Sequence, residues 1–231
     1  METLLQAGLS ALDLPTEGAA ALTRYADLLL EKNKVMNLTA ITDPHDVATL
    51  HFLDSAALLT LADFRGKTVA DVGTGAGFPG VPLRILEPSI RLTLLDSLQK
   101  RIGFLGEVCQ ALDLSDVELV HGRAEEFAAG HREHFDIVTS RAVADLRLLS
   151  ELCLPLVKVG GQFLAMKSVD CGQELEDAAS AIRLLGGSLE AVRDYTIPGT
   201  EVRHRLVIIQ KVDATPKKYP RAFAKIKKHP L

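Results

Sequence analysis

The sequence predicts an α/β fold in which an open, mostly parallel sheet carries helices on both faces and follows an N-terminal helical segment. Short apolar runs alternate with helical patterns from residue 68 onward, which is typical of parallel strands joined by right-handed crossovers. A glycine-rich loop follows the first of these runs. The last two strands are too close in sequence for a crossover, so we expect them to pair antiparallel.

The first 65 residues are expected to form a helical cap. The apolar residues of "TEGAAALTRYADLLLEKNK" recur at helical intervals, and Asp43-Pro44 is a favourable helix start. Four polar residues fall at the junction between this cap and the sheet, where they are expected to help shape a substrate pocket: Asn33, Asn37, His51 and Asp54. The alternative is that Asn37 and Asp54 hold turns and caps and that His51 is a structural histidine, which we favour for His51.

Residues 66–213 are expected to form the sheet domain and residues 214–231 a basic tail. Apolar runs predict strands at Thr68–Val72, Leu92–Leu95, Val117–Val120, Phe135–Thr139, Gly161–Met166, Leu189–Tyr195 and His204–Gln210. Helical spacing predicts helices at Val81–Leu86, Leu98–Leu112, Ala124–Ala129, Val143–Val157 and Gln173–Leu185.

The composition argues against a membrane-spanning protein and against a secreted one. No apolar run approaches the roughly 20 residues that a bilayer requires, and the first residues lack the pattern of a signal peptide. The three cysteines form no C-x-x-C pair, as expected in a reduced cytosol. We therefore expect a cytoplasmic protein, without a membrane partner, and take a monomer as the default state.

The charge of the chain is unevenly distributed. The overall net charge is −4, but the segment from Ala214 onward contains six basic residues and no acidic residue, which leaves 20 basic and 30 acidic residues in the remainder. Tyr219 and Phe223 lie among the lysines, and three prolines favour an extended segment. Lysines can follow phosphates while bases stack on aromatic rings. The predicted RNA-binding residues are Lys217, Lys218, Arg221, Lys225, Lys227 and Lys228; a solubilising tail is the alternative.

The glycine loop has two interpretations. Gly75 to Gly80 fits the G-x-G-x-x-G pattern of dinucleotide-binding folds, whereas Asp71 to Gly77 fits the acid-x-G-x-G-x-G loop of S-adenosylmethionine-dependent enzymes. The carboxylate of Asp71 would repel a pyrophosphate but attract the ammonium of a methionine moiety. Pro79 has no N–H to donate to a phosphate. Together with the reversed last strands, these features favour a class I methyltransferase fold.

This interpretation assigns the site residues. Gly73, Gly75 and Gly77 would line the methionine and ribose side, with Phe78 as an apolar surface beside them. Asp96 ends the second strand and would accept the ribose hydroxyls. Glu125 would accept the adenine amino group, Ala124 would leave room for the ring, and Arg141 ends the fourth strand. A first-turn helix acid is the alternative for Glu125.

Seven motifs, in order, resemble the small-subunit ribosomal RNA methyltransferase G family, also called glucose-inhibited division protein B: "NKVMNLTA", "HFLDS", "DVGTGAGFPGVPL", "LLDSLQKRIGFL", "GRAEEF", "TSRAVADL" and "GGQFLAMK". The resemblance implies transfer of a methyl group from S-adenosylmethionine to N7 of one guanine in 16S rRNA of the small ribosomal subunit. It also implies that cofactor contacts fall on Gly73, Phe78, Ala124, Glu125 and Arg141.

The chemistry needs no catalytic base, because guanine N7 carries an unprotonated lone pair. We expect catalysis by proximity and orientation, with no catalytic acid or base and no metal; "HREH" at 131–134 lacks a second ligand cluster and is interpreted as an exposed loop. Two alternatives are a methyltransferase acting on a different RNA or other substrate and a non-catalytic RNA-binding factor of ribosome assembly.

Overall fold

A computed structural model describes residues 1–141 and 144–231. Its centre is a seven-stranded sheet in the order β3-β2-β1-β4-β5-β7-β6. The strands are β1 (Thr68–Val72), β2 (Arg91–Asp96), β3 (Val117–His121), β4 (Phe135–Arg141), β5 (Val157–Ser168), β6 (Gly187–Thr196) and β7 (Arg203–Lys211). Among the described strands, β7 runs antiparallel to both of its neighbours, β5 and β6, while β1 to β5 pair parallel. The predicted fold class and the antiparallel end of the sheet are confirmed.

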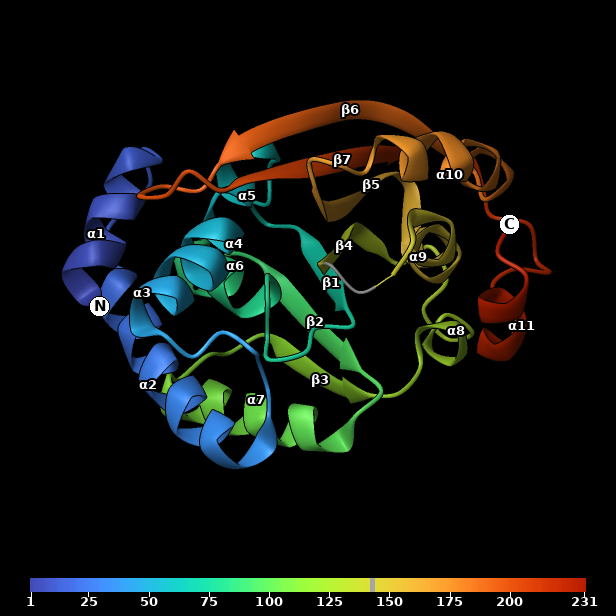
Figure 1. Ribbon diagram of the computed structural model, residues 1–231. Helices are drawn as coiled ribbons and strands as arrows, with labels where there is room; N and C mark the ends of the chain where they lie inside the picture. The colour runs from blue at the N-terminus through green and yellow to red at the C-terminus, as the bar shows by residue number, and fades with distance from the viewer. Residues whose placement is uncertain (142–143) are drawn as a thin grey trace.

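Helices cover both faces of the sheet (Figure 1). The segment before the sheet contributes α1 (Glu2–Ala11), α2 (Ala19–Met36), α3 (Pro44–Asp46), the π-helical segment η1 (Val47–Leu53), α4 (Asp54–Ala56) and α5 (Leu58–Leu61). The crossovers and the tail contribute α6 (Gly80–Leu86), α7 (Gln99–Ala111), α8 (Ala124–Phe127), α9 (Leu146–Cys153), the 3₁₀ turn η2 (Leu154–Leu156), α10 (Gly172–Leu184) and α11 (Phe223–Lys228).

Two hydrophobic clusters hold these layers together. The first joins α1, α2 and η1 to α6, α7 and one face of the sheet, with Leu22 and Phe52 among its buried members. The second lies on the other face, under α8 to α11, and contains Phe163 of β5 and Ile226 of the tail. The N-terminal helices therefore share one core with the sheet, because their apolar faces pack both against one another and against it.

Chain order reverses between β1 and β4, which lie side by side at the centre of the sheet. In open α/β sheets, ligands bind beyond the carboxyl ends of the strands at such a reversal. The glycine loop leaves β1 at this point and Arg141 ends β4. A hydrogen bond from Ser140 Oγ to the Val72 carbonyl oxygen, at 2.9 Å, joins the two strand ends.

Two predicted elements differ from the structure around α9. The expected helix Val143–Val157 begins at Leu146, where Asp145 accepts the N–H of Arg147, and ends at Cys153; position 143 lies outside the described residues. Pro155 turns the chain through η2, and β5 starts at Val157, earlier than the predicted Gly161. An irregularity in the β4–β5 register, around Gly160, separates the two halves of β5. Gly160 and Gly161 interrupt the apolar pattern, so the pattern does not indicate that the strand begins at Val157.

The tail also differs from the expected extended segment. It contains α11, whose Ile226 is fully buried, because Phe223 and Ile226 are three residues apart and face the second cluster together. The prolines of the tail all lie outside this helix.

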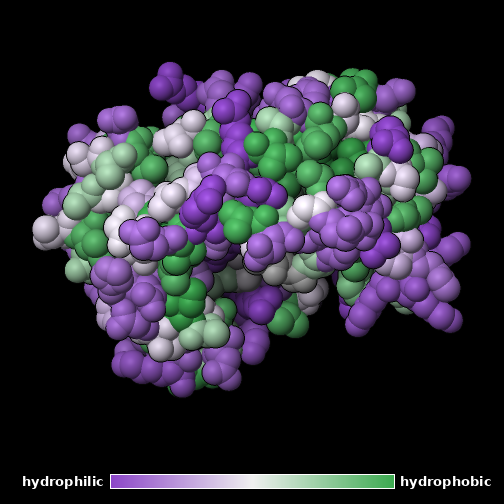
Figure 2. Space-filling view, turned by 45° about the horizontal axis from the view of Figure 1, so that its top comes forward, coloured by the Kyte–Doolittle hydropathy of each residue, from purple (hydrophilic) through white to green (hydrophobic). Residues whose placement is uncertain are grey.

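The surface strand β6 carries the apolar side chains Leu189 and Val192 toward solvent. Figure 2 shows apolar surface interspersed with polar groups on the face where this edge of the sheet comes forward.

Among the described residues, no helix combines the length and the apolar character that a membrane crossing requires.

Candidate active site

Asp71 fixes the glycine loop from the end of β1. One carboxylate oxygen, Oδ2, accepts the Thr74 hydroxyl at 2.7 Å and the Gly80 N–H at 2.9 Å. The other, Oδ1, is buried and has no hydrogen-bond partner among the described residues. Burial raises the pKa of Asp71 to about 6, against the opposing effect of the Thr74 and Gly80 hydrogen bonds. A buried unpartnered carboxylate oxygen suits a cationic ligand.

The three predicted loop glycines differ in what they face. Gly73, Gly75 and Gly77 all have positive φ, at +72°, +61° and +103°. A Cβ on Gly73 would meet nothing within 4 Å, and one on Gly75 would meet only the Gly73 carbonyl oxygen at 3.9 Å. A Cβ on Gly77 would overlap Tyr25 and Leu105. Gly73 and Gly75 thus border open space, whereas Gly77 permits close packing against α2 and α7.

Asp96 ends β2 and is buried. Its Oδ2 accepts the Gly75 N–H at 3.0 Å and Arg101 Nη1 at 3.1 Å, and its Oδ1 accepts the Leu98 N–H at 2.9 Å. The carboxylate therefore connects the glycine loop to the start of α7, while its edge faces the cavity described next.

A cavity of about 170 Å³, here called the Asp96 cavity, opens beside the ends of β1, β2 and β3. It brings together four of the predicted cofactor residues, Gly73, Asp96, Ala124 and Glu125. The remaining lining comes from Val72, Leu95, Ser97, Gly122, Arg123, Leu152 and Phe223. No sequence pattern indicated that Phe223, from the tail, would line this cavity.

Phe78 and Arg141 lie elsewhere, in a stack that joins η1 to the sheet. The Phe78 ring is stacked between His51, at a centroid distance of 4.5 Å, and Tyr25, at 5.5 Å. The Arg141 guanidinium carbon lies 4.9 Å from the same ring centroid. The Phe78 ring is therefore only 4% exposed, so the apolar surface expected beside the cofactor is largely covered by these neighbours.

Arg141 is the centre of a polar network. Its Nη2 donates to His51 Nδ1 at 2.9 Å, and its Nη1 donates to the Leu50 carbonyl oxygen at 3.2 Å and to Asp54 Oδ2 at 3.4 Å. Burial, followed by the neighbouring Arg141 charge, lowers the pKa of His51 to about 3. A neutral His51 that accepts at Nδ1 must carry its proton on Nε2, which donates to Thr39 Oγ1 at 2.8 Å.

Asp54 extends this network to the last two strands. Its Oδ1 accepts the Tyr195 hydroxyl of β6 and His204 Nδ1 of β7, both at 2.8 Å. The hydrogen bond to Asp54 raises the pKa of His204 against partial burial. The sequence analysis did not predict Tyr195 and His204 as site residues. More than 140 residues separate each of them from Asp54, and no local pattern links such positions.

A second cavity, of about 400 Å³ and here called the Arg141 cavity, opens over this network. Its walls come from the N-terminal segment and from the ends of β4, β5 and β7: Ile41, Leu50, His51, Asp54, Arg141, Met166, Lys167, Ser168, Val202 and His204. Val72 lines the Asp96 cavity, and its carbonyl oxygen is bonded to Ser140, the neighbour of Arg141. The two cavities therefore lie on either side of the junction between β1 and β4.

Of the four junction residues predicted to shape a pocket, His51 and Asp54 line the Arg141 cavity. Asn33 instead holds the turn after α2, accepting the Leu38 and Thr39 N–H groups and donating to the Thr39 carbonyl oxygen. Asn37 ends α2 with a left-handed backbone, φ +49°. These two asparagines support the loop that carries Thr39.

The predicted RNA-binding residues divide into two groups. The five lysines are exposed: Lys217, Lys218, Lys225, Lys227 and Lys228. Arg221 instead pairs with Glu151 of α9, which is fully buried, and Tyr219 is 7% exposed, so the Tyr219 ring is covered and offers little surface for stacking. The "HREH" segment is partly buried rather than an exposed loop, because Arg132 and Glu133 bind the backbone of the tail.

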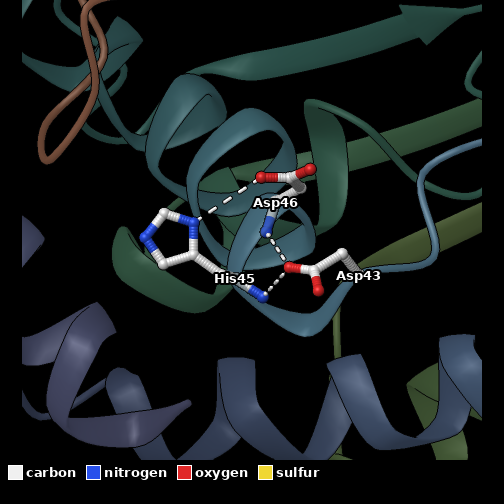
Figure 3. Close-up of side chains that lie close together, drawn as sticks. All are labelled: Asp43, His45 and Asp46. Carbon is white, nitrogen blue, oxygen red and sulfur yellow. Dashed lines mark hydrogen bonds and ion pairs between the residues drawn. The ribbon is translucent and has the colours of Figure 1, made fainter.

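Asp43, His45 and Asp46 place ligand-type atoms within 4.8 Å of one another (Figure 3). The Asp43 carboxylate, however, accepts the N–H groups of His45 and Asp46, as the predicted helix cap. All three residues are exposed. The cluster is explained by capping, and we assign no ligand to it.

Comparisons with known proteins identify the family. Residues 19–203 match a family described as rRNA small subunit methyltransferase G. The chain is 48% identical to the ribosomal RNA small subunit methyltransferase G of Clostridium perfringens over 210 residues, covering 90% of this chain and 88% of the relative. It is 50% identical to the protein of the same name from Staphylococcus epidermidis, over 90% and 88% of the two chains.

Among solved structures, the chain is similar to TrmN from Thermus thermophilus, with a TM-score of 0.54 and 25% identity over 68% of this chain and 48% of that one. It is also similar in fold to TYW2 from M. jannaschii, solved in complex with AdoMet, with a TM-score of 0.56 and 12% identity over 69% and 75% of the two chains.

Proposed function

Because this chain belongs to the rRNA small subunit methyltransferase G family, we propose that it transfers the methyl group of S-adenosylmethionine to N7 of a guanine in 16S rRNA. The observation that carries the proposal is the pair of cavities on either side of the β1–β4 junction. One contains the polar groups that a nucleoside cofactor needs, and the other is lined by donors at the ends of neighbouring strands. A cytoplasmic site of action follows from the ribosomal substrate.

The residues that line the first cavity, together with Asp71 and Gly75 of the adjoining glycine loop, suit the cofactor. Gly73 and Gly75 leave open space where a Cβ would project, and Asp71 Oδ1 is a buried carboxylate oxygen without a described partner. Asp71 would face the cationic methionine end, Asp96 the ribose hydroxyls and Glu125 the adenine amino group. When bound, S-adenosylmethionine supplies an electrophilic methyl group on a sulfonium.

The Arg141 cavity is the proposed seat of the guanine. Guanine offers two acceptors on its Hoogsteen edge, O6 and N7. Arg141, Lys167 and His204, whose side chains carry N–H groups, line this cavity. A donor that turned toward O6 would orient the base while leaving N7 free to attack. Orientation of this kind contributes about 7–11 kcal/mol. His51, with a pKa of about 3, is too weak a base to take a proton at neutral pH, and N7 attack needs none.

The test uses tritiated S-adenosylmethionine with undermethylated small subunits and, in parallel, naked 16S rRNA, followed by digestion and identification of the labelled nucleoside. We expect 7-methylguanosine, and the better substrate will show when in assembly the protein acts. A different labelled nucleoside would favour methylation of another target. Measurable cofactor binding without any label would favour the non-catalytic assembly factor.

Substitutions of the glycine loop separate cofactor binding from folding. Gly77→Ala should lower the free energy of unfolding by about 2 kcal/mol, because its Cβ would overlap Tyr25 and Leu105 at positive φ. Gly73→Ala should cost about 1 kcal/mol from backbone strain alone, yet weaken S-adenosylmethionine binding more than Gly77→Ala does. Urea unfolding and calorimetry measure the two effects. The reverse order of cofactor affinities would place the cofactor away from Gly73.

The tail lysines are proposed to contact RNA phosphates. Replacing Lys217, Lys218, Lys225, Lys227 and Lys228 with alanine should weaken rRNA binding and flatten its salt dependence, by about 0.7 in log–log slope for each phosphate that a lysine no longer neutralises. Filter binding at several salt concentrations measures the slope, with Lys34→Ala on α2 as the control. An unaltered slope would identify the tail as a solubilising segment.

A further inference from the structure

The tail is fastened to the sheet domain at two places. Glu151 of α9 is fully buried, and its Oε1 accepts the Arg221 backbone N–H at 2.9 Å and Arg221 Nε at 2.8 Å, while its Oε2 accepts Nη2 at 2.5 Å. Arg132 donates to the carbonyl oxygens of Tyr219, at 2.7 Å, and of Thr215. Buried, bidentate arginine–carboxylate contacts fix position as well as charge. The segment around residue 221 is therefore held rigidly against α9.

Phe223 follows this attachment by two residues and starts α11. Phe223 lines the Asp96 cavity together with residues of β1, β2 and α8, and the Arg123 guanidinium carbon lies 5.1 Å from its ring centroid. Ile226, one turn later, is fully buried in the second cluster. Figure 1 shows α11 beside α8, the helix that begins with Ala124 and Glu125. The tail therefore supplies one residue of the cavity wall.

The opposite side of the same short helix faces solvent. Lys225, Lys227 and Lys228 are exposed, and Lys217 and Lys218 are exposed just before the Arg221 attachment. One segment thus carries an aromatic wall of the cavity and five exposed cationic groups.

We propose that Phe223 is a cofactor contact at the adenine end of the Asp96 cavity, and that α11 thereby couples cofactor binding to RNA binding. The inference rests on the proposed function. An aromatic ring lends a large, rigid apolar face to a purine, and bases bind such faces without regard to sequence. A ligand that contacts Phe223 adds a contact to the docked α11 and so stabilises the arrangement in which its lysines are presented to the RNA. By linkage, RNA bound to those lysines must strengthen cofactor binding by the same factor.

The first test measures the contact without RNA, using S-adenosylhomocysteine as the probe. Phe223→Ala should weaken its binding by about tenfold in calorimetry, while urea unfolding without ligand verifies that the variant is folded. The chain contains no tryptophan, so Phe223→Trp places a unique fluorophore at the cavity, and its emission should change on saturation with S-adenosylhomocysteine. Val212→Trp, at an exposed position before the tail, should show no change.

An unaltered affinity of folded Phe223→Ala, or an emission from Phe223→Trp that saturating ligand leaves unchanged, would overturn the contact. Neither the affinity nor the emission measurement requires methyl transfer. Both results are therefore independent of which nucleoside is methylated. A different nucleoside product would overturn the proposed function and leave these two results in place.

The second test measures the coupling. In the wild type, saturating S-adenosylhomocysteine should raise the affinity for naked 16S rRNA, and the rRNA should raise the affinity for the ligand by an equal factor. Phe223→Ala should reduce that factor toward one, as should replacement of the five lysines with alanine. A wild-type factor of one, or a factor unaffected in Phe223→Ala, would overturn the coupling.

Discussion

Asp71→Asn should weaken S-adenosylmethionine binding by about 30-fold while leaving the fold intact. The amide retains an oxygen for the hydrogen bonds from Thr74 and Gly80, but it removes the negative charge from the buried Oδ1 position, and a hydrogen bond to a charged group contributes about 2 kcal/mol. Calorimetry on the variant, with Asp213→Asn at an exposed position as the control, measures the decrease in affinity.

The pH dependence of binding provides a second measure of Asp71. Its pKa of about 6 means that the carboxyl is largely ionised at pH 7 and becomes protonated as the pH falls to 5. A cationic ligand binds the ionised form, so wild-type affinity should fall through this range, by up to about tenfold per pH unit well below the pKa. The asparagine variant should show a flat profile. A wild-type profile as flat as that of the variant would remove Asp71 from the cofactor site.

The same shift affects stability with the opposite sign. The folded-state pKa of this acid lies above its usual value of 3.8, so the folded state binds the proton more tightly than the unfolded state does. The stabilisation is present at low pH and is lost as the pH rises from about 4 to about 6. Without ligand, Asp71→Asn should therefore be at least as stable as the wild type at pH 7.

Asp54→Ala should lower the free energy of unfolding by about 3 kcal/mol, because truncating one partner leaves the others buried without their acceptor. Three groups from three elements lose a hydrogen bond: the Tyr195 hydroxyl, His204 Nδ1 and Arg141 Nη1. Urea unfolding measures the destabilisation, with Asp46→Asn, exposed in the same helical region, as the control. An unchanged midpoint would show that the network does not hold the N-terminal helices to the sheet.

His204 adds a pH signature to this prediction. Its pKa is raised by the hydrogen bond to Asp54, so its contribution to stability is present below the unfolded value of about 6.5 and is lost as the pH rises through the folded value. The wild type should therefore gain stability between pH 8 and pH 6 relative to Asp54→Ala. Identical pH profiles for the two proteins would exclude a charged His204–Asp54 pair.

Local patterns predicted most of the sheet. Each strand from β1 to β4 is a short apolar run, and the reversed pair follows from a gap too short for a crossover. The early start of β5 was missed because Gly160 and Gly161 interrupt its apolar pattern. The boundaries at residues 66 and 214 remain predictions, and the cluster that joins Leu22 to the sheet shows that the first helices pack as part of the common core.

The candidate site was only partly predictable. Residues that follow strand ends, such as Asp96 and Glu125, meet in one cavity because parallel strands end at a common edge. The contacts of Arg141 with His51 and Asp54 depend on how the N-terminal helices pack, which no spacing along the chain specifies. The Arg221–Glu151 pair was not predicted for the same reason: it depends on how the tail packs against α9, and the RNA contact expected of Arg221 remains a prediction.

The two cavities draw on different parts of the chain. The described lining of the Asp96 cavity begins at Val72, whereas the Arg141 cavity takes Ile41, Leu50, His51 and Asp54 from the segment before the sheet. Selection can therefore act on the two separately. Under the proposed assignment of the target base to the Arg141 cavity and the methyl donor to the Asp96 cavity, substitutions among residues 41–54 would change the modified nucleotide without altering the donor site, so relatives with new targets should differ first in this N-terminal segment.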